Sequence, residues 1–235
     1  MKFVDSVLDL IFPPICKICG NKLDEKRKAC ICAECWGKIR IIKPPACVSC
    51  GKQLKIEHEI FCGDCSQSRM SFVDNRSAAV YDDVMRAAIH LFKYGDKRKL
   101  GVVFGEMMAE FIEKDGGLDD IDCIIPVPSF GRKRRDFNQS ALLADYLGKR
   151  FDLPVYKDVL FRATDTLPQH GLNRDERIQN VKGAFEIKNK DRIKWAVVLL
   201  VDDILTTGAT ADECARALLS ADANSVRVFT LARGE

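Results

Sequence analysis

The sequence has no long apolar run, and aromatic side chains make up only 8% of its 235 residues. No run approaches the roughly 18 apolar residues that a membrane-spanning helix needs. The first ten residues also lack the apolar core of a secretory signal, because Asp5 and Asp9 interrupt it. The formal net charge is only +3, so bulk electrostatics neither requires nor excludes nucleic acid. We therefore expect a cytoplasmic protein, and association with the inner face of the membrane through partners stays open.

Cysteine is scarce after residue 66, where only Cys123 and Cys214 occur, and it is concentrated before that point. Eight of the eleven cysteines form four Cys-x-x-Cys pairs: Cys16/Cys19, Cys32/Cys35, Cys47/Cys50 and Cys62/Cys65. Two such pairs supply the four thiolates that tetrahedral zinc prefers. Four thiolates leave no open coordination position, so the pattern predicts two structural zinc ions.

The pairing of the cysteines leaves alternatives open. The spacing favours two successive sites, although a crossed arrangement of first with third and second with fourth pair fits it as well. A reducing cytosol disfavours disulfides, and an iron–sulfur cluster is the main competing interpretation. Cys30 could substitute as a ligand, whereas Cys123 and Cys214 are expected in the core. Three glycines follow cysteines closely and are expected to adopt unusual backbone angles: Gly20, Gly51 and Gly63.

The chain after the cysteine-rich segment alternates helical and strand patterns. Helices are expected over residues 82–95, 100–114 and 138–150 and after residue 210. Strands are expected over residues 123–127, near 155, and over 196–201 and 226–231. Such alternation indicates an α/β fold with a parallel sheet covered on both faces. The segment Val197–Val201 has no polar residue and belongs in the centre of that sheet.

Two acidic residues follow this central strand, at the edge where open parallel sheets bind ligands. We expect the backbone to turn at Asp202 and Asp203, so that both carboxylates serve one site. They would accept hydrogen bonds from vicinal hydroxyls or hold a hydrated magnesium ion.

The next residues are small and can turn consecutive N–H groups toward one anion: Thr206, Thr207, Gly208, Ala209 and Thr210. Thr210 and Glu213 are predicted to form a capping box at the start of a helix. The sequence has no Gly-x-x-x-x-Gly-Lys motif, which excludes a nucleoside triphosphatase loop. Carboxylates beside a phosphate-binding loop fit a ribose 5-phosphate.

Residues 198–210 resemble the binding signature for phosphoribosyl diphosphate (PRPP) in type I phosphoribosyltransferases. With the cysteine pairs, the whole chain resembles the ComF family of competence-associated proteins. Three further stretches support the resemblance: residues 92–95, 126–139 and 166–185. The resemblance implies a double zinc-ribbon domain over residues 1–68 and a type I phosphoribosyltransferase-like domain over 69–235, whose parallel sheet is flanked by helices.

The resemblance also implies roles for individual residues. Asp202 and Asp203 would hold the ribose as the catalytic pair, with Mg²⁺ bound alongside PRPP, and residues 206–210 would bind its 5-phosphate. Arg162 and Lys182 would contact the departing diphosphate, and residues 162–182 would close over the sugar. A basic run would face the diphosphate or bind nucleic acid: Arg132, Lys133, Arg134 and Arg135. Two departures from the family pattern are Asp136, which could weaken diphosphate binding, and Asp222, which ends a helix where glycine is common but can adopt the left-handed conformation.

Three functions compete. The first is Mg-dependent phosphoribosyl transfer to an unidentified acceptor. The second is a DNA-uptake factor that handles single strands in natural transformation, with the same pocket sensing PRPP or gripping a nucleic-acid phosphate. The third is a ligand-controlled scaffold whose ribbons bind a helicase or a membrane partner. Few aromatic side chains are available for base stacking: Trp36, Phe61, Phe130 and Phe137.

Overall fold

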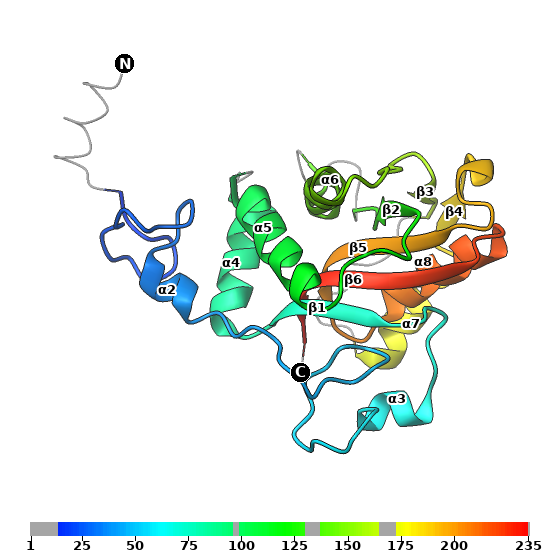
Figure 1. Ribbon diagram of the computed structural model, residues 1–235, viewed down its shortest axis with the longest axis horizontal. Helices are drawn as coiled ribbons and strands as arrows, with labels where there is room; N and C mark the ends of the chain where they lie inside the picture. Colours follow the sequence, from blue (N-terminus) through cyan, green and yellow to red (C-terminus); the bar gives the residue numbers. More distant parts are fainter. Residues whose placement is uncertain (1–13, 96–98, 130–136, 165–172, 235) are drawn as a thin grey trace.

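A four-stranded parallel sheet forms the centre of the protein (Figure 1). The structure is a computed structural model that describes residues 14–95, 99–129, 137–164 and 173–234. In spatial order the strands are β1 (Asn75–Val80), β6 (Ser225–Arg233), β5 (Val197–Leu205) and β2 (Cys123–Pro126). The apolar strand β5 lies between β6 and β2, as its sequence predicted.

Helices cover both faces of the sheet. One face carries three helices: α4 (Asp83–Tyr94), α5 (Lys99–Lys114) and α6 (Gln139–Phe151). The other face carries α8 (Ala209–Ser220) and a small antiparallel pair, β3 (Leu160–Arg162) with β4 (Phe185–Ile187). Helix α7 (Arg174–Val181) packs beside α8, and a short 3-10 turn spans Lys190–Arg192. The α/β fold class with a parallel sheet flanked by helices is therefore confirmed.

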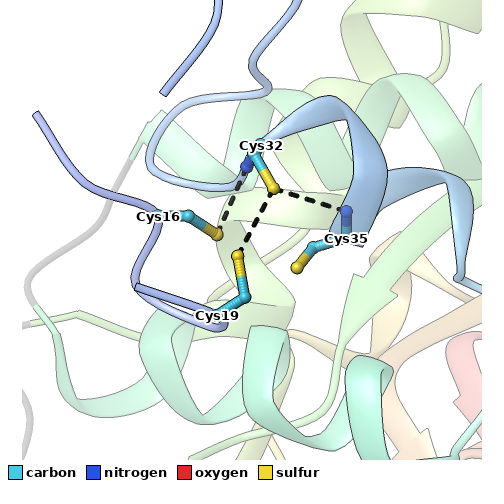
Figure 2. A group of neighbouring side chains, drawn as sticks. All are labelled: Cys16, Cys19, Cys32 and Cys35. Atoms are coloured by element: carbon cyan, nitrogen blue, oxygen red, sulfur yellow. Dashed lines mark hydrogen bonds between the residues drawn. The ribbon is translucent and has the colours of Figure 1, made fainter. Parts of the chain in front are cut away.

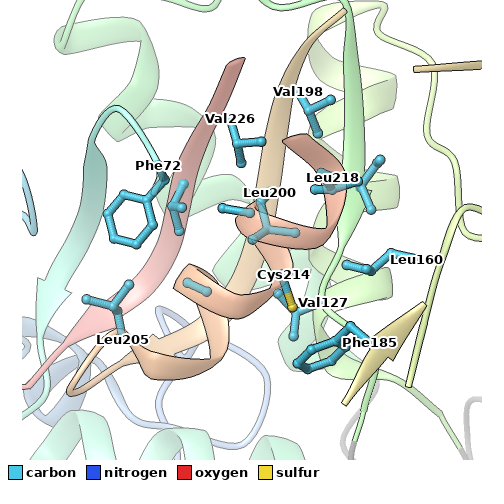
Figure 3. Packing of buried hydrophobic residues seen from close by; sticks show 14 of the residues in the cluster. Phe72, Val127, Leu160, Phe185, Val198, Leu200, Leu205, Cys214, Leu218 and Val226 are labelled. Atoms are coloured by element: carbon cyan, nitrogen blue, oxygen red, sulfur yellow. The ribbon is translucent and has the colours of Figure 1, made fainter. Parts of the chain in front are cut away.

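Alternation along β5 explains why this strand has no polar face in its first half. Leu199 and Val201 pack against the layer of α4, α5 and α6. Val198 and Leu200 pack on the other side, where Cys214 and other residues of α8 cover them (Figure 3). Because both faces are buried, a polar residue in this half would be buried without a partner.

Most of the predicted helices are confirmed, with ends set by local chemistry. Asp82 precedes α4 and its side chain accepts a hydrogen bond from Met85 N. Asn138 caps α6 in the same way. Asp222 adopts the left-handed conformation after α8, with φ of 69°, as expected.

The sequence did not predict β1, β3, β4 or α7, and the strand expected near residue 155 is a single bridge from Val155 to Ile124. Strand β1 escaped prediction because it begins with polar residues that are nonetheless buried. Asn75 and Ser77 are 0% and 1% exposed: Asn75 donates to Ser77 Oγ and to Cys50 O of the cysteine-rich segment, and Ser77 shares a hydrogen bond with Thr230 of β6.

The outer edge of β1 is covered by the chain that links the two cysteine-rich halves. Ile42 N donates to Ala78 O at 3.1 Å, and Val80 N donates to Arg40 O at 2.8 Å. Ile41 forms the antiparallel bridge with Ala79 between these two bonds. No helix in the described ranges combines the length and apolar character needed to cross a bilayer.

The first half of the cysteine-rich segment, which carries Cys16 to Cys35, packs on α5. The ring of Trp36 stacks on Phe104 with centroids 5.9 Å apart, and Phe104 also meets Phe92 edge to face at 5.4 Å. Phe104 is fully buried in the same cluster as Cys16 and Cys32. This aromatic group joins the segment to the layer of helices.

We expect Phe104→Ala to lower the free energy of unfolding by about 3–5 kcal/mol, because it leaves a cavity between α5, Phe92 and Trp36. Urea unfolding followed by tryptophan fluorescence measures this loss. The control is Val102→Ala on the same helix, where the side chain is 59% exposed and the change should stay within about 0.5 kcal/mol. Equal losses in the two variants would contradict the packing described for Phe104.

Candidate functional site: two cysteine clusters and the carboxyl end of β5

The eight paired cysteines form two clusters, each with four sulfur atoms within 4.8 Å of one another. The first cluster is shown in Figure 2: Cys16, Cys19, Cys32 and Cys35. The second cluster joins the remaining pairs: Cys47, Cys50, Cys62 and Cys65. The successive pairing is therefore confirmed and the crossed arrangement is excluded. Cys30 belongs to neither cluster, and Cys123 and Cys214 are buried in β2 and α8 as expected.

Each cluster is built from one tight turn and one short helix. In the turns, Gly20 N donates to Cys16 O and Gly51 N donates to Cys47 O, with positive φ at both glycines. The second pair of each cluster begins a short helix, α2 (Ala33–Gly37) or α3 (Gly63–Gln67). The expectation for Gly63 was wrong, because it is the first residue of α3 and needs no unusual angle.

The geometry of both clusters fits zinc. Cys19 Sγ and Cys32 Sγ are 3.7 Å apart, as are Cys50 Sγ and Cys62 Sγ. Zinc–sulfur bonds of about 2.3 Å in a tetrahedron place neighbouring sulfurs about 3.8 Å apart. In each cluster these two sulfurs therefore lie at the spacing that the metal requires, and all four lie within 4.8 Å of one another.

The electrostatics of the first cluster also favour a cation. Burial alone would raise the pKa of Cys16, but backbone N–H groups of Cys19, Cys32 and Ile18 lower it to about 6. The pKa of Cys35 is raised, first by burial and then by the neighbouring cysteines. A divalent metal offsets both burial and the repulsion among thiolates, so all four can ionise.

Arg233 connects the second cluster to the sheet. Arg233 is 7% exposed, and its guanidinium donates to Cys50 O at 2.9 Å and to Cys50 Sγ at 3.3 Å. The same group donates to Leu205 O at 3.2 Å, at the end of β5. One buried side chain therefore contacts both a sulfur ligand and the residue that precedes the loop of residues 206–208.

The two aspartates lie within β5, and the expectation that the backbone turns at them was wrong. Strand β5 continues to Leu205, where it still pairs with Arg233 of β6. Its pairing with β2, however, ends at Val201 opposite Pro126. Because the pairing with β6 keeps the strand extended, Asp202 and Asp203 follow the alternation of the strand at a point where one neighbouring strand is missing.

Each aspartate has its own partners. Lys93, near the end of α4, contacts both carboxylate oxygens of Asp203, at 2.9 and 2.7 Å. Asp202 Oδ1 accepts from Ser140 Oγ at 2.9 Å and from Asp203 N at 2.8 Å. The first turn of α6 thus closes the gap that β2 leaves beside β5.

The pKa of Asp202 is raised to about 7. Burial is the largest cause and the neighbouring Asp203 carboxylate the second, while Lys93 and the hydrogen bonds from Asp203 N and Ser140 act in the opposite direction. Near neutral pH this carboxyl group is partly protonated, and a cation at the site would favour its charged form.

The loop after β5 carries three consecutive backbone N–H groups, at Thr206, Thr207 and Gly208, that donate to no residue in the described part of the chain. Gly208 has φ of 83°, and a Cβ there would meet the Met70 side chain at 3.0 Å. Ala209 begins α8 directly behind the loop. Adjacent N–H groups at a helix N-terminus form a site for an anion.

The capping box predicted at Thr210 and Glu213 was wrong. Gly208 occupies the cap position, and Thr210 already lies inside α8. The Glu213 carboxylate instead accepts from Gly183 N at 2.8 Å. A capping box does occur at the start of α7, between Asn173 and Glu176.

Helix α7 brings a basic residue to the loop. Arg177 donates to Thr206 Oγ1 at 3.0 Å, so part of the segment expected to close over the sugar does reach the loop. The Arg162 guanidinium lies over the Phe185 ring at 4.9 Å, on the face covered by α8. Lys182 follows α7 with an exposed side chain. The basic run Arg132, Lys133, Arg134 and Arg135 lies outside the described residues, as do Asp136 and Phe130.

Sequence reasoning missed three residues that organise this region. Lys93 was noticed only as part of the stretch 92–95, without a role. Ser140 and Arg233 carried no signal, because a serine in a first helical turn and an arginine at the end of an apolar strand are both common.

The fold and the cysteine clusters define an α/β protein with an amino-terminal double zinc ribbon. The family model described as "Double zinc ribbon domain" matches residues 7–66. Competence protein F of Haemophilus influenzae is 28% identical over 86% of this chain and 96% of its own length. Competence protein ComFC of Bacillus subtilis is 29% identical over 90% and 86%, and DNA utilization protein YhgH of Escherichia coli K12 is 28% identical over 95% and 99%. Over most of its length the chain is therefore similar to competence and DNA utilization proteins of the ComF type.

Solved structures are similar over part of the chain. A hypoxanthine phosphoribosyl transferase from Trypanosoma cruzi is 16% identical, with a TM-score of 0.35 over 60% of this chain and 66% of its own. An allosteric regulatory enzyme of purine biosynthesis is 18% identical, with a TM-score of 0.37 over 57% of this chain and 25% of its own.

We expect Arg233→Met to speed zinc release from the second cluster and leave the first unchanged. The substitution removes a hydrogen bond to a ligand sulfur, and loss of such an outer-shell contact typically weakens metal binding about 10–100-fold. Zinc transfer to a coloured chelator should then separate into two phases of equal amplitude. The control, Arg227→Met on the same strand, breaks ion pairs with Asp74 and Asp120 but touches no cysteine, and it should leave the release unchanged. Faster release of all the zinc in Arg233→Met would contradict the assignment.

The raised pKa of Asp202 predicts a pH-dependent stability. The carboxyl group is charged in the unfolded chain above about pH 4 but only above about pH 7 in the folded chain, so its burial destabilises the fold increasingly as pH rises across this window. Asp202→Asn keeps the acceptor oxygen and removes the charge, so its stability relative to the wild type should increase between pH 5 and pH 8 by roughly 1–3 kcal/mol. Urea unfolding at several pH values measures the difference, and a constant difference would rule out this titration.

Proposed function

We propose that the chain binds Mg-PRPP at the carboxyl end of β5 and acts through this site in natural competence and DNA uptake. One observation supports the proposal most: two carboxylates on β5 lie a few residues before three N–H groups that donate to no described residue. Carboxylates suit the hydroxyls of a pentose, and the loop suits its phosphate.

In this proposal each part of the site has one task. Thr206, Thr207, Gly208, Ala209 and Thr210 bind the 5-phosphate at the N-terminus of α8. Asp202 and Asp203 accept hydrogen bonds from the ribose hydroxyls. Lys93 holds Asp203 in place before the sugar arrives, because the two ion-pair contacts fix the carboxylate plane.

Magnesium fits as an ion that arrives with the diphosphate. Both oxygens of Asp203 are already engaged by Lys93, which leaves few protein oxygens for a complete coordination shell. Mg²⁺ usually keeps several waters and binds through one or two carboxylates plus substrate phosphates. When bound, it would neutralise charge on the diphosphate.

Transfer would proceed by displacement at C1 of the ribose. The acceptor donates an electron pair to C1 while the C1–O bond breaks, and that bonding pair leaves with the diphosphate. Arg162, Lys182 and the basic run of residues 132–135 supply positive charge for the departing group.

A second candidate is a protein that senses PRPP or binds single-stranded DNA without catalysis, as a scaffold for a DNA-uptake helicase. The names of the relatives, competence protein and DNA utilization protein, favour a role in handling DNA. Release of diphosphate on addition of ammonia, nucleobases or other acceptors would distinguish an enzyme from such a scaffold.

We expect Mg-PRPP to raise the melting temperature of the wild type and not that of Asp203→Asn. A ligand present at 100 times its Kd stabilises the fold by about 2.7 kcal/mol, which a thermal scan resolves readily. Each shift is measured from the variant's own melting temperature, because Asp203→Asn also loses the ion pair with Lys93. The control is Asp145→Asn, an acidic residue on the surface of α6 that pairs with Lys157. Equal shifts in the wild type and Asp203→Asn would remove the sugar site from β5.

A further inference from the structure

A cavity of about 580 Å³ lies between the second zinc ribbon and the carboxyl ends of three strands. Tyr81 follows β1, Gly234 follows β6, and Thr206 and Thr207 follow β5, and all of them line it. Lys52 of the second ribbon forms part of the opposite wall. Ligands of open parallel sheets bind beyond the carboxyl ends, and this volume is typical of small-molecule sites. The second ribbon therefore forms one wall of a cavity that extends from the loop of residues 206–208.

Buried contacts fix the position of the second ribbon relative to the sheet. Besides the bonds of Arg233 to Cys50 and Leu205, Asn75 Nδ2 donates to Cys50 O at 3.0 Å. Asn75 N donates to Ser49 O at 2.8 Å, and a Cβ on Gly51 would lie 2.6 Å from Asn75 O. The ribbon thus packs so closely on the start of β1 that both walls of the cavity belong to one rigid arrangement.

The charged side chains that line the cavity are mostly cationic. The cations are Arg40, Lys52, Arg86, Arg177 and Arg233, and the carboxylates are Asp64, Asp82 and Asp83. Arg233 is committed to Cys50, and Arg40 pairs with Asp82 at 2.9 Å. Lys52 forms no ion pair with any residue that the structure describes, and the contact of Arg86 with Asp83 is long, at 3.6 Å. Lys52 and Arg86 are therefore available for an anionic ligand.

The cavity also offers a flat apolar surface. Tyr81 is among its lining residues, and the Arg86 guanidinium lies over one face of the Tyr81 ring, 5.6 Å from the centroid. An aromatic face beside a guanidinium can stack a nucleobase, while nearby cations bind its phosphate. Neither an apolar ligand nor a simple inorganic anion would use both features.

We propose that this cavity binds a nucleotide, either a free mononucleotide or the terminal nucleotide of a single strand. The base lies against Tyr81 and the phosphate binds Lys52 and Arg86. The proposal rests on the proposed function, because the loop that would bind the 5-phosphate of PRPP forms one wall, and it adds a second ligand beside the sugar. The second zinc ribbon then contributes directly to binding.

The test uses isothermal titration calorimetry on the full, zinc-loaded chain with two probes, thymidine 5′-monophosphate and a short 5′-phosphorylated oligothymidylate. Lys52→Gln and Arg86→Gln should each raise the Kd of the tighter probe about tenfold. Arg86 is on the exposed surface of α4, so its replacement does not threaten the zinc ribbon. The matched control is Lys26→Gln, an exposed lysine on the first ribbon, which should leave the Kd unchanged.

The two probes separate the sources of the nucleotide. Equal affinities indicate a free mononucleotide, whereas tighter, strongly salt-dependent binding of the oligonucleotide indicates a strand. Binding of neither probe, or equal Kd values for Lys52→Gln and Lys26→Gln, overturns the inference.

Measurements with PRPP test this proposal separately from the proposed function. Asp203→Asn should weaken PRPP and spare the nucleotide, and Lys52→Gln should do the reverse. If Asp203→Asn abolishes nucleotide binding, or if Lys52→Gln weakens both ligands equally, the nucleotide occupies the sugar site and the inference fails. If PRPP fails to bind the wild type while the nucleotide still depends on Lys52, the proposed function fails and the cavity assignment stands.

Discussion

The buried guanidinium of Arg233 joins the second zinc ribbon to the sheet, and the relative position of these two parts depends on its hydrogen bonds. It donates at once to the carbonyl and sulfur of Cys50 and to the carbonyl of Leu205. Removing any one partner would leave a buried polar group without compensation, which is costly inside a protein. The second zinc ribbon, the last strand and the end of β5 therefore hold one another in position. The second cysteine cluster is thereby connected to the residue before the loop through a single side chain.

The aspartate pair shows how an extended strand can still build a polar site. The side chains of Asp202 and Asp203 alternate along β5, yet β2 has already ended beside them, so helices α4 and α6 supply Lys93 and Ser140 from outside the sheet. Burial and the proximity of two carboxylates make full ionisation unfavourable without an added cation. A cation bound at the site would therefore reduce the repulsion between the two carboxylates, and a hydrogen-bond donor would stabilise their charged form.

Much of this architecture could be predicted from short-range patterns. The Cys-x-x-Cys spacing located both metal sites, and the apolar run of β5 placed it inside the sheet, because these signals lie in consecutive residues. Strand β1 could not be predicted, since the buried polar side chains of Asn75 and Ser77 have partners far away in the sequence, Cys50 O in the second ribbon for Asn75 and Thr230 in β6 for Ser77. The capping box was assigned to Thr210 and Glu213 from their Thr-x-x-Glu spacing, but Gly208 is the cap residue and the Glu213 carboxylate accepts a hydrogen bond from Gly183 N, 30 residues earlier in the chain. Lys93 and Arg233 owe their roles to partners 110 and 183 residues away.

The segment that links the two ribbons protects the sheet from aggregation. Residues 40–42 pair with the free side of β1, so the sheet ends in a short antiparallel segment and not in an open row of donors and acceptors. If residues 40–42 did not cover it, the exposed edge of β1 would be a template for self-association. Loss of zinc would loosen the anchors on both sides of this segment, so metal-starved chains should form aggregates through their sheets before they unfold.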